Sequence, residues 1–267
     1  MVVSVMIQLE NVTKVLSGRT ILSNLSVTIE EGETLVLLGR SGTGKSVTLR
    51  HIVGLMQPDS GRVEVLGKSL TETSTDQLAA VRSQVGYLFQ DGALLNWLSI
   101  AENVALPLLE THKLAKSEVD QRVKDALREV ELDQHGDKLP GEISGGMRKR
   151  AGLARALVSH PKIVLHDEPT SGLDPISSSI INRLVNRLKS TGITQVMVTH
   201  DMNSAFEVAD RIALLHDGQI QALENVDDFR NSADPAVRQF LEGQISGPLS
   251  RGFLDGNPNE DDRNEVS

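Results

Sequence analysis

Eight consecutive residues near the N-terminal end have the composition of a loop that binds phosphate. They are Gly39, Arg40, Ser41, Gly42, Thr43, Gly44, Lys45 and Ser46. Glycines allow the backbone N–H groups of such a loop to point at an anion, and a helix that starts there adds its positive end. The Lys45 ammonium is placed to bind the β- and γ-phosphates, and the Ser46 hydroxyl to bind Mg²⁺. This phosphate loop predicts a nucleotide site.

A pair of neighbouring acids follows the apolar run 163–165. If this run is a buried strand, its end delivers Asp167 to the magnesium side of the phosphates. Glu168 is then the candidate general base that polarises the attacking water. The alternative is a solvated acidic turn, which is less consistent with two acids at the end of a strand.

Two single residues extend the candidate site. Gln90 follows the run 85–89, where its amide could contact Mg²⁺ and the attacking water, or could simply be solvated. His200 follows the run 195–198, and its ring could reach the γ-phosphate. A lone His is more often structural, but ligands of α/β proteins bind at the carboxyl ends of parallel strands. We interpret the other histidines as surface or packing residues, and leave His166 open because it precedes the acidic pair.

These residues need a sheet that brings them to one edge, and the sequence predicts a parallel one. Four apolar runs have the length of strands buried on both faces, and helical stretches separate most of them. The runs are residues 34–38, 85–89, 163–165 and 195–198. This pattern predicts an α/β fold with right-handed crossovers.

Other segments have different periodicities. Alternation of polar and apolar residues at 7–12 and 25–29 predicts a half-buried antiparallel sheet. Residues 217–218 are Asp-Gly between apolar runs and predict a hairpin. Residues of about 91–157 have helical character, with Ser117 as an expected helix cap.

Composition limits the possible functions. The 267 residues carry a net charge of -9, which argues against nucleic acid as a partner. Residues 244–267 are acidic and lack periodic apolar positions, so we expect a disordered tail. The chain has no Cys for a disulfide framework, and its apolar start is expected to form a strand rather than a leader. Without an apolar run long enough for a membrane helix, membrane association has to come through a partner.

Six motifs occur in the order and approximate spacing of an ATP-binding cassette (ABC) ATPase. They are residues 39–46, Gln90, residues 144–147, 167–168 and 171–174, and His200. The chain therefore resembles this family, and the motifs are similar to its Walker A loop, Q-loop, signature, Walker B with catalytic Glu, D-loop and switch His. The resemblance implies a P-loop NTPase (ABC ATPase) domain over residues 1–243, with ATP and Mg²⁺ as ligands.

The resemblance also implies a site shared by two copies of the chain. Each nucleotide lies between the phosphate loop of one copy and the signature of the other. Ser144 and the amides of Gly145 and Gly146 then supply hydrogen bonds to the γ-phosphate in place of an arginine finger, and Asp174 joins the ATP-binding set. The implied catalytic residues are Glu168, His200 and Gln90, and the implied Mg²⁺ ligands are Ser46, Gln90 and Asp167.

Some positions depart from the family pattern. Leu16 stands where an aromatic residue usually stacks on adenine, so base selectivity is weak or comes from elsewhere. In the signature, Met147 replaces Gln and Ile143 replaces Leu. The Ser-Gly-Gly-Met sequence is similar to the ATPase subunit of Mla/Mce-type phospholipid transporters, as are three other segments. These are residues 90–95, 102–108 and 234–243.

This second resemblance implies an ATPase at the cytoplasmic face of the inner membrane that powers phospholipid transport. The implied partners are an integral-membrane permease, a lipid-binding MCE-type subunit and a small cytoplasmic regulator. Three alternatives are an importer of polar solutes, a soluble cassette acting on ribosomes or DNA, and a non-hydrolysing regulatory module. Intact Glu168 and His200 argue against the last.

Two segments have both a functional and a structural interpretation. Residues 94–100, with the single Trp97, correspond to the region of the family that receives the coupling helix of the membrane subunit; alternatively Trp97 belongs to the core. The helix expected at about 234–243 either docks on a second copy or a partner, or covers its own core.

Overall fold

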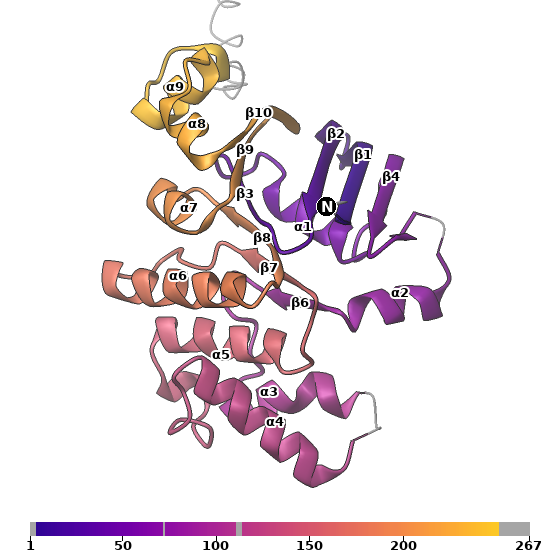
Figure 1. The fold of residues 1–267 in the computed structure, drawn as a ribbon, viewed down its shortest axis with the longest axis vertical. Helices are drawn as coiled ribbons and strands as arrows, with labels where there is room; N and C mark the ends of the chain where they lie inside the picture. The colour runs from indigo at the N-terminus through magenta and orange to yellow at the C-terminus, as the bar shows by residue number, and fades with distance from the viewer. Residues whose placement is uncertain (1–3, 72, 111–113, 251–267) are drawn as a thin grey trace, which may run out of the picture.

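The computed structural model describes residues 4–71, 73–110 and 114–250, and it contains two separate sheets (Figure 1). The smaller sheet has the order β2-β1-β4-β5 and antiparallel pairings. Its strands are β1 (Val5–Leu16), β2 (Arg19–Glu30), β4 (Ser60–Val65) and β5 (Lys68–Ser69). In β2, Leu25, Val27 and Ile29 are buried while Ser26 and Thr28 are exposed. The predicted half-buried antiparallel sheet is confirmed.

The larger sheet has the order β10-β9-β3-β8-β7-β6. Its strands are β3 (Thr34–Leu38), β6 (Val85–Leu88), β7 (Ile163–Asp167), β8 (Thr194–Thr199), β9 (Arg211–His216) and β10 (Gln219–Asn225). All neighbouring strands pair in parallel except β9 and β10, which form the hairpin predicted at Asp217-Gly218. The α/β fold class is therefore confirmed, and the carboxyl ends of β3, β6, β7 and β8 meet at one edge.

Both faces of the larger sheet are covered, which explains the uninterrupted apolar runs. Leu35 and Leu37 face a core shared with the smaller sheet and α1 (Lys45–Ile52). Val36 and Leu38 face a second core beneath α6 (Pro175–Ser190) and α7 (Met202–Val208). These two helices lie on the opposite side of the sheet from β1 and β2 in Figure 1.

The helical insertion packs around a third core, which it shares with β6, β7 and α6. It consists of α3 (Ile100–Leu109), α4 (Lys116–Glu129) and α5 (Gly145–Leu157), which pack on one another and on β6. The cap expected at Ser117 is wrong, because α4 starts two residues earlier, with Ala115 at the N-cap and no side-chain cap. Glu118 in the first turn and the buried residues Val119 and Val123 favour the helix without a capping hydroxyl.

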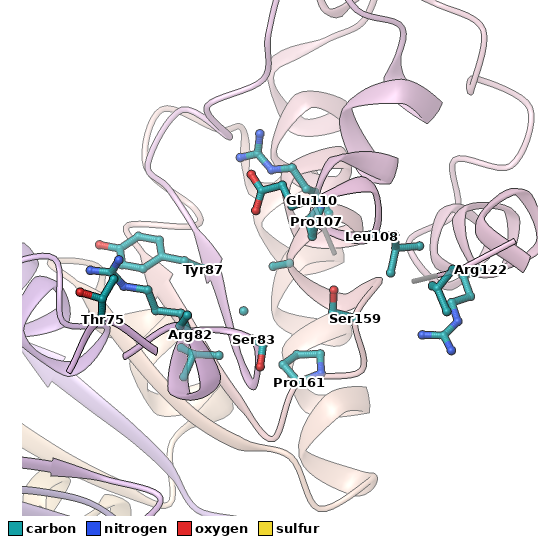
Figure 2. A pocket seen from close by; sticks show the side chains of 16 residues that line it. Thr75, Arg82, Ser83, Tyr87, Pro107, Leu108, Glu110, Arg122, Ser159 and Pro161 are labelled. Atoms are coloured by element: carbon teal, nitrogen blue, oxygen red, sulfur yellow. The ribbon is translucent and has the colours of Figure 1, made fainter. Parts of the chain in front are cut away.

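A groove of about 730 Å³ lies between this insertion, β6 and the helix that precedes β6. Its walls come from α2 (Thr75–Arg82), β6, α3, α4 and α5. Figure 2 shows the side chains that line it. Thr75, Arg82 and Tyr87 line one side, and Pro107 and Glu110 line another. The groove includes none of the phosphate-loop residues and extends toward the amino ends of β6 and β7, where Ser83 and Pro161 line it.

The C-terminal helices α8 (Val226–Asn231) and α9 (Pro235–Glu242) close the fold. Asp234 caps α9 by accepting from the N–H groups of Ala236 and Val237. Val237 is fully buried, and Phe240 and Leu241 pack against the same core. The apolar face of α9 thus covers its own chain, which favours that interpretation over a free docking face.

The expectation of disorder from residue 244 does not hold for residues 244–250. Gln239 Oε1 accepts from Leu249 N–H at 2.7 Å, and its amide donates to Gln244 O at 3.2 Å. Leu249 is buried, which gives the segment an anchor that periodicity did not reveal. Residues 251–267, the acidic part of the expected tail, lie outside the described residues. Within the described ranges, no helix is long and apolar enough to cross a membrane.

Candidate nucleotide site

The phosphate loop connects β3 to α1, and glycine sets its shape. Gly44 has φ 104°, and a Cβ there would lie 2.9 Å from Ile21 O, so a larger residue does not fit. The backbone N–H groups of Ser41, Gly42 and residues 44–46 donate to no acceptor within the described parts of the chain. Because these donors stand at the N-terminus of α1, they form a site for an anion.

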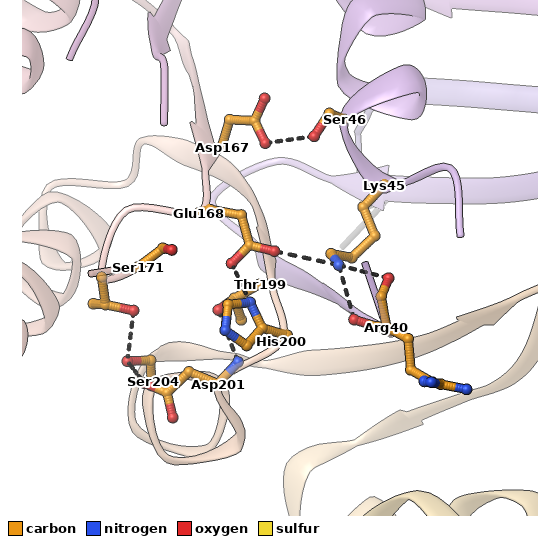
Figure 3. Close-up of polar contacts among 12 residues, drawn as sticks. Arg40, Lys45, Ser46, Asp167, Glu168, Ser171, Thr199, His200, Asp201 and Ser204 are labelled. Atoms are coloured by element: carbon orange, nitrogen blue, oxygen red, sulfur yellow. Dashed lines mark hydrogen bonds and ion pairs between the residues drawn. The ribbon is translucent and has the colours of Figure 1, made fainter. Parts of the chain in front are cut away.

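Lys45 brings positive charge into this loop. Its Nζ donates to Gly39 O at 2.8 Å and to Arg40 O at 3.0 Å, and it forms an ion pair with Glu168 Oε1 at 3.2 Å (Figure 3). Only 6% of the Lys45 side chain is exposed, so the charge depends on these partners. The oxygens of a triphosphate can take their place.

Ser46 and Asp167 form the candidate Mg²⁺ site. Ser46 Oγ donates to Asp167 Oδ1 at 2.7 Å, joining the first turn of α1 to the end of β7. Both supply hard oxygen ligands, and Mg²⁺ is usually bound by one or two protein groups together with water and phosphate oxygens. The pair therefore fits a metal ion that binds together with the phosphates.

The second oxygen of Asp167 is held by the neighbouring strand. Tyr87 OH donates to Asp167 Oδ2 at 3.1 Å. Burial, followed by the charge of Asp167, raises the pKa of Tyr87, so the hydroxyl keeps its proton. Motif reasoning overlooked Tyr87. No sequence signal indicated this bond, because it requires β6 to lie beside β7. In that register Tyr87 pairs with Leu165, and Asp167 lies two residues further on the same face.

Glu168 has an unusual backbone and a fully engaged carboxylate. Its φ is 49°, in the left-handed region that non-glycine residues rarely occupy. Its N–H donates to Val198 O at 2.9 Å, which fixes this turn to β8. Oε1 pairs with Lys45, and Oε2 lies 2.9 Å from His200 Nδ1 (Figure 3). These two partners orient the carboxylate at the carboxyl edge of the sheet, and its role as general base remains a prediction.

Lys149 supports this turn from behind and was also overlooked. Its Nζ donates to Glu168 O at 3.0 Å and to Ser171 O at 2.6 Å. Only 5% of Lys149 is exposed, and burial lowers the pKa of its amine. A Lys inside the buried part of α5 was the signal, because buried Lys residues are rare unless they have partners.

His200 lies at the end of β8, as its sequence position suggested. Asp201 follows it and caps α7 by accepting from Asn203 N–H at 3.0 Å. This start of a helix turns the His200 ring out of the sheet, leaving 59% of the side chain exposed. The ring can therefore meet both Glu168 and a phosphate that enters the site.

Gln90 is not brought together with the other candidates. It follows β6 by two residues and is exposed, and its side chain makes no hydrogen bond to another described residue. Its backbone position is at the same sheet edge as Asp167, because β6 and β7 are parallel neighbours. A role in binding Mg²⁺ or water remains a prediction.

The signature residues stand apart from the phosphate loop. Ser144 caps α5 by accepting from Met147 N–H at 3.2 Å. A Cβ at Gly146 would lie 3.2 Å from Ser177 Oγ, so the glycine turn rests against α6. Within the described residues, no hydrogen bond or ion pair joins residues 144–146 to residues 39–46. This arrangement agrees with a site completed by a second copy.

Asp174 has a structural function within the chain. It caps α6, where its Oδ1 accepts from the N–H groups of Ile176 and Ser177, both at 3.0 Å. Its Oδ2 accepts from Ser177 Oγ at 2.6 Å, and this bond lowers the pKa of the Asp174 carboxyl. A contact between Asp174 and ATP remains a prediction.

His166 is a packing residue, although it precedes Asp167. It is completely buried, and its Nε2 lies 3.0 Å from Gln195 Oε1. The Gln195 amide donates to Thr34 Oγ1 and Val185 O, so the network runs beneath α6 and away from the phosphate loop. Burial lowers the pKa of His166 to about 4, which keeps the ring neutral.

Residues 22–171, more than half of the chain, match the family model described as ABC transporter. The chain belongs to the ABC transporter family. Cassettes of this family hydrolyse ATP, and the hydrolysis is coupled to transport. A dimeric ATP-binding cassette in a post-hydrolysis state with ADP and Pi has a TM-score of 0.77 and 34% identity, covering 83% of this chain and 99% of its own. For cbiO1 from Clostridium perfringens the TM-score is 0.78 and the identity 28%, covering 86% and 92%.

The names of similar proteins state different transported substances. The probable ribonucleotide transport ATP-binding protein mkl of Mycobacterium tuberculosis H37Rv is 41% identical, over 92% of this chain and 68% of its own. The methionine import ATP-binding protein MetN 1 of Pseudomonas putida is 40% identical, over 89% and 72%. The intermembrane phospholipid transport ATP-binding protein MlaF of Escherichia coli K12 is 35% identical, over 91% of both chains. Family membership thus establishes an ATPase subunit of an ABC transporter and leaves the cargo open.

Proposed function

We propose that this cassette drives the movement of phospholipid between membranes, as the ATPase of an Mla/Mce-type transporter. The observation that carries the proposal is the signature sequence Ser-Gly-Gly-Met, together with the similarity to MlaF. Met147 is half-buried and packs against the core of the helical insertion. Met147, in place of the family's usual Gln, leaves Ser144 and the two glycine amides unchanged as donors for phosphate. The difference lies in the side chain that faces the helical insertion.

Hydrolysis in this proposal uses the groups already described. The N–H groups of Ser41, Gly42 and residues 44–46, together with Lys45, bind the phosphates. Ser46 and Asp167 would hold a metal ion, which would supply charge neutralisation of the phosphates. Glu168 accepts a proton from the attacking water, and His200 keeps the carboxylate oriented. In a head-to-tail dimer, Ser144 and its following amides complete the site of the other copy.

The membrane subunit of the transporter would contact the groove and its surroundings. Trp97 is 76% exposed, so it is not the core residue that the sequence allowed as an alternative. Exposed aromatic side chains are enriched at protein interfaces. The position of Trp97 just before α3, on the helical insertion, supports docking of a permease on this part of the cassette.

The wider assembly follows from the same proposal. It contains two copies of the cassette at the cytoplasmic face of the inner membrane, a permease, an MCE-type lipid-binding subunit and a small cytoplasmic regulator. The alternative is an importer of a polar solute, which the similarity to MetN 1 favours. Both alternatives use the same ATPase chemistry and differ in the membrane subunit.

Co-purification separates these alternatives. The cassette, isolated from its own membranes in mild detergent, should bring down a permease with bound phospholipid, identified by lipid mass spectrometry. Recovery with a solute-binding importer and no enrichment of phospholipid would contradict the lipid proposal. Recovery with ribosomes and without a membrane subunit would contradict a transport function altogether.

A further inference from the structure

We infer that Tyr87 is a positioning residue that links the groove between the subdomains to the Mg²⁺ carboxylate Asp167. The inference rests on the proposed function in one respect, namely that the membrane subunit is the natural occupant of the groove. The link itself is a property of this chain and is testable without that subunit.

Asp167 is held at both oxygens by residues from different elements. Oδ1 accepts from Ser46 Oγ at 2.7 Å, and Oδ2 accepts from Tyr87 OH at 3.1 Å. A carboxylate with both oxygens fixed cannot rotate freely, so its orientation toward a metal ion depends on both donors. Loss of a partner of this kind typically lowers metal affinity or activity by about 10–100-fold.

Tyr87, the donor of this second hydrogen bond, lies in the wall of the groove. Tyr87 is on β6, the edge strand of the larger sheet, so the sheet continues on one side of it only. Figure 2 shows its side chain beside Thr75 and Arg82, which also line the groove. The ring is half-buried and therefore within reach of whatever fills this space.

The ring has a second connection to the nucleotide site. It stacks on Phe89, with ring centroids 4.2 Å apart and an angle of 26° between the planes. Phe89 directly precedes Gln90, the residue expected to contact Mg²⁺ and water. A displacement of the Tyr87 ring therefore acts on the hydrogen bond to Asp167 and on the segment that carries Gln90.

The first experiment removes only the hydroxyl. Tyr87→Phe keeps the ring and its stacking on Phe89, so the fold should be retained, which thermal unfolding verifies. We expect the Mg²⁺ concentration for half-maximal binding of a fluorescent ATP analogue to rise about tenfold, and ATPase activity to recover at high Mg²⁺ with nearly unchanged kcat. An unchanged Mg²⁺ midpoint would overturn the positioning role. A fall in kcat that high Mg²⁺ does not restore would also overturn it.

The second experiment fills the groove artificially. Tyr87 is the single Tyr and the chain has no Cys, so 3-fluorotyrosine gives one ¹⁹F resonance and an engineered Cys gives one labelling site. Ala79→Cys, in the groove wall, is labelled with a bulky maleimide. Ala80→Cys is the matched control, because Ala80 is exposed on the same helix and does not line the groove.

Label at position 79 should move the ¹⁹F resonance and shift the Mg²⁺ midpoint, while label at position 80 should do neither. In a Tyr87→Phe background, label at position 79 should leave the midpoint unchanged. Equal effects of both labels, or a shift that persists without the Tyr87 hydroxyl, would overturn the link. Because only the full-length cassette, Mg²⁺ and a nucleotide are used, failure here is distinct from failure of the lipid proposal, which the co-purified membrane subunit decides.

Discussion

The ammonium of Lys149 lies 3.0 Å from the carbonyl oxygen of Glu168. This contact joins the helix that begins at the signature to the peptide of the residue we assign as the general base. In a head-to-tail dimer, the signature serves one nucleotide and Glu168 of the same chain serves the other. Lys149 thereby connects the two sites through a single side chain.

Replacing Lys149 by Met should reduce kcat by about tenfold or more, with a much smaller change in KM for ATP. The reason is that the carbonyls of Glu168 and Ser171 lose a charged donor, and hydrogen bonds to charged groups contribute about 1.5–3 kcal/mol. Steady-state ATPase kinetics measure the effect. Lys149→Gln, which keeps a donor, should recover part of kcat, and Lys124→Met on exposed α4 should change nothing. Equal losses for Met and Gln would contradict positioning through the hydrogen bonds.

Stability should decrease in acid because of His166. Burial lowers the pKa of His166 from 6.5 to about 4, so the unfolded chain binds a proton that the folded chain rejects. The free energy of unfolding should therefore fall as the pH drops from 6.5 toward 4, by at most about 3 kcal/mol from this group. Urea unfolding at a series of pH values measures it.

The control for this prediction compares the pH dependence of stability in the unmodified chain and in the variant His166→Leu. His166→Leu should be less stable at neutral pH, because Gln195 Oε1 loses its donor, but its stability should depend less steeply on pH between 6.5 and 4. The exposed residue His160 provides a matched variant, His160→Gln, whose pH profile should follow the unmodified chain. Parallel profiles for His166→Leu and the unmodified chain would show that His166 does not titrate in this way.

Asp174 offers a way to separate a helix cap from a contact with ATP. Asp174→Ala should destabilise the chain by about 1 kcal/mol, measured by urea unfolding, because the start of α6 loses its acceptor. Asp174→Asn should restore most of this stability, since Asn is an equally good cap. If the carboxylate also serves ATP, Asn should restore stability without activity; full activity in the Asn variant would limit Asp174 to capping.

Base selectivity can be tested at Leu16. With an aliphatic side chain where the family stacks an aromatic ring on adenine, ATP and GTP should be hydrolysed with similar kcat/KM. Leu16→Tyr should lower KM for ATP severalfold, because base–aromatic stacking contributes about 1–3 kcal/mol. A strong preference of the unmodified chain for ATP would show that another residue recognises the base.

The sequence predicted those parts of the fold and site that depend on local pattern. Alternation in β2, the buried run of β3 and the glycines around Lys45 are each determined by neighbouring residues, and the structure contains the corresponding elements. The sequence could place Asp167 and Glu168 at the end of a strand, because an apolar run followed by acids is itself a local feature.

Contacts that depend on strand order and side-chain reach were not predictable in this way. The bond from Tyr87 to Asp167 requires β6 to lie beside β7, although 80 residues separate the two in sequence. Lys149 reaches Glu168 only because α5 packs near the end of β7. The anchor at Leu249 depends on Gln239, whose role no periodicity indicates.

The central claim is that Glu168 is the base of an ATP site shared by two copies of the chain. Glu168→Gln removes the carboxylate that polarises water, so turnover should fall by about 10²–10⁴-fold while ATP still binds. The decisive measurement is the mass of this variant in solution with ATP and Mg²⁺, by light scattering after gel filtration. We predict a shift from the 29.0 kDa protomer to a stable dimer of twice that mass, and no shift when Ser144→Arg is added. Normal turnover in Glu168→Gln, or a protomer that keeps its mass with ATP bound, would contradict the claim.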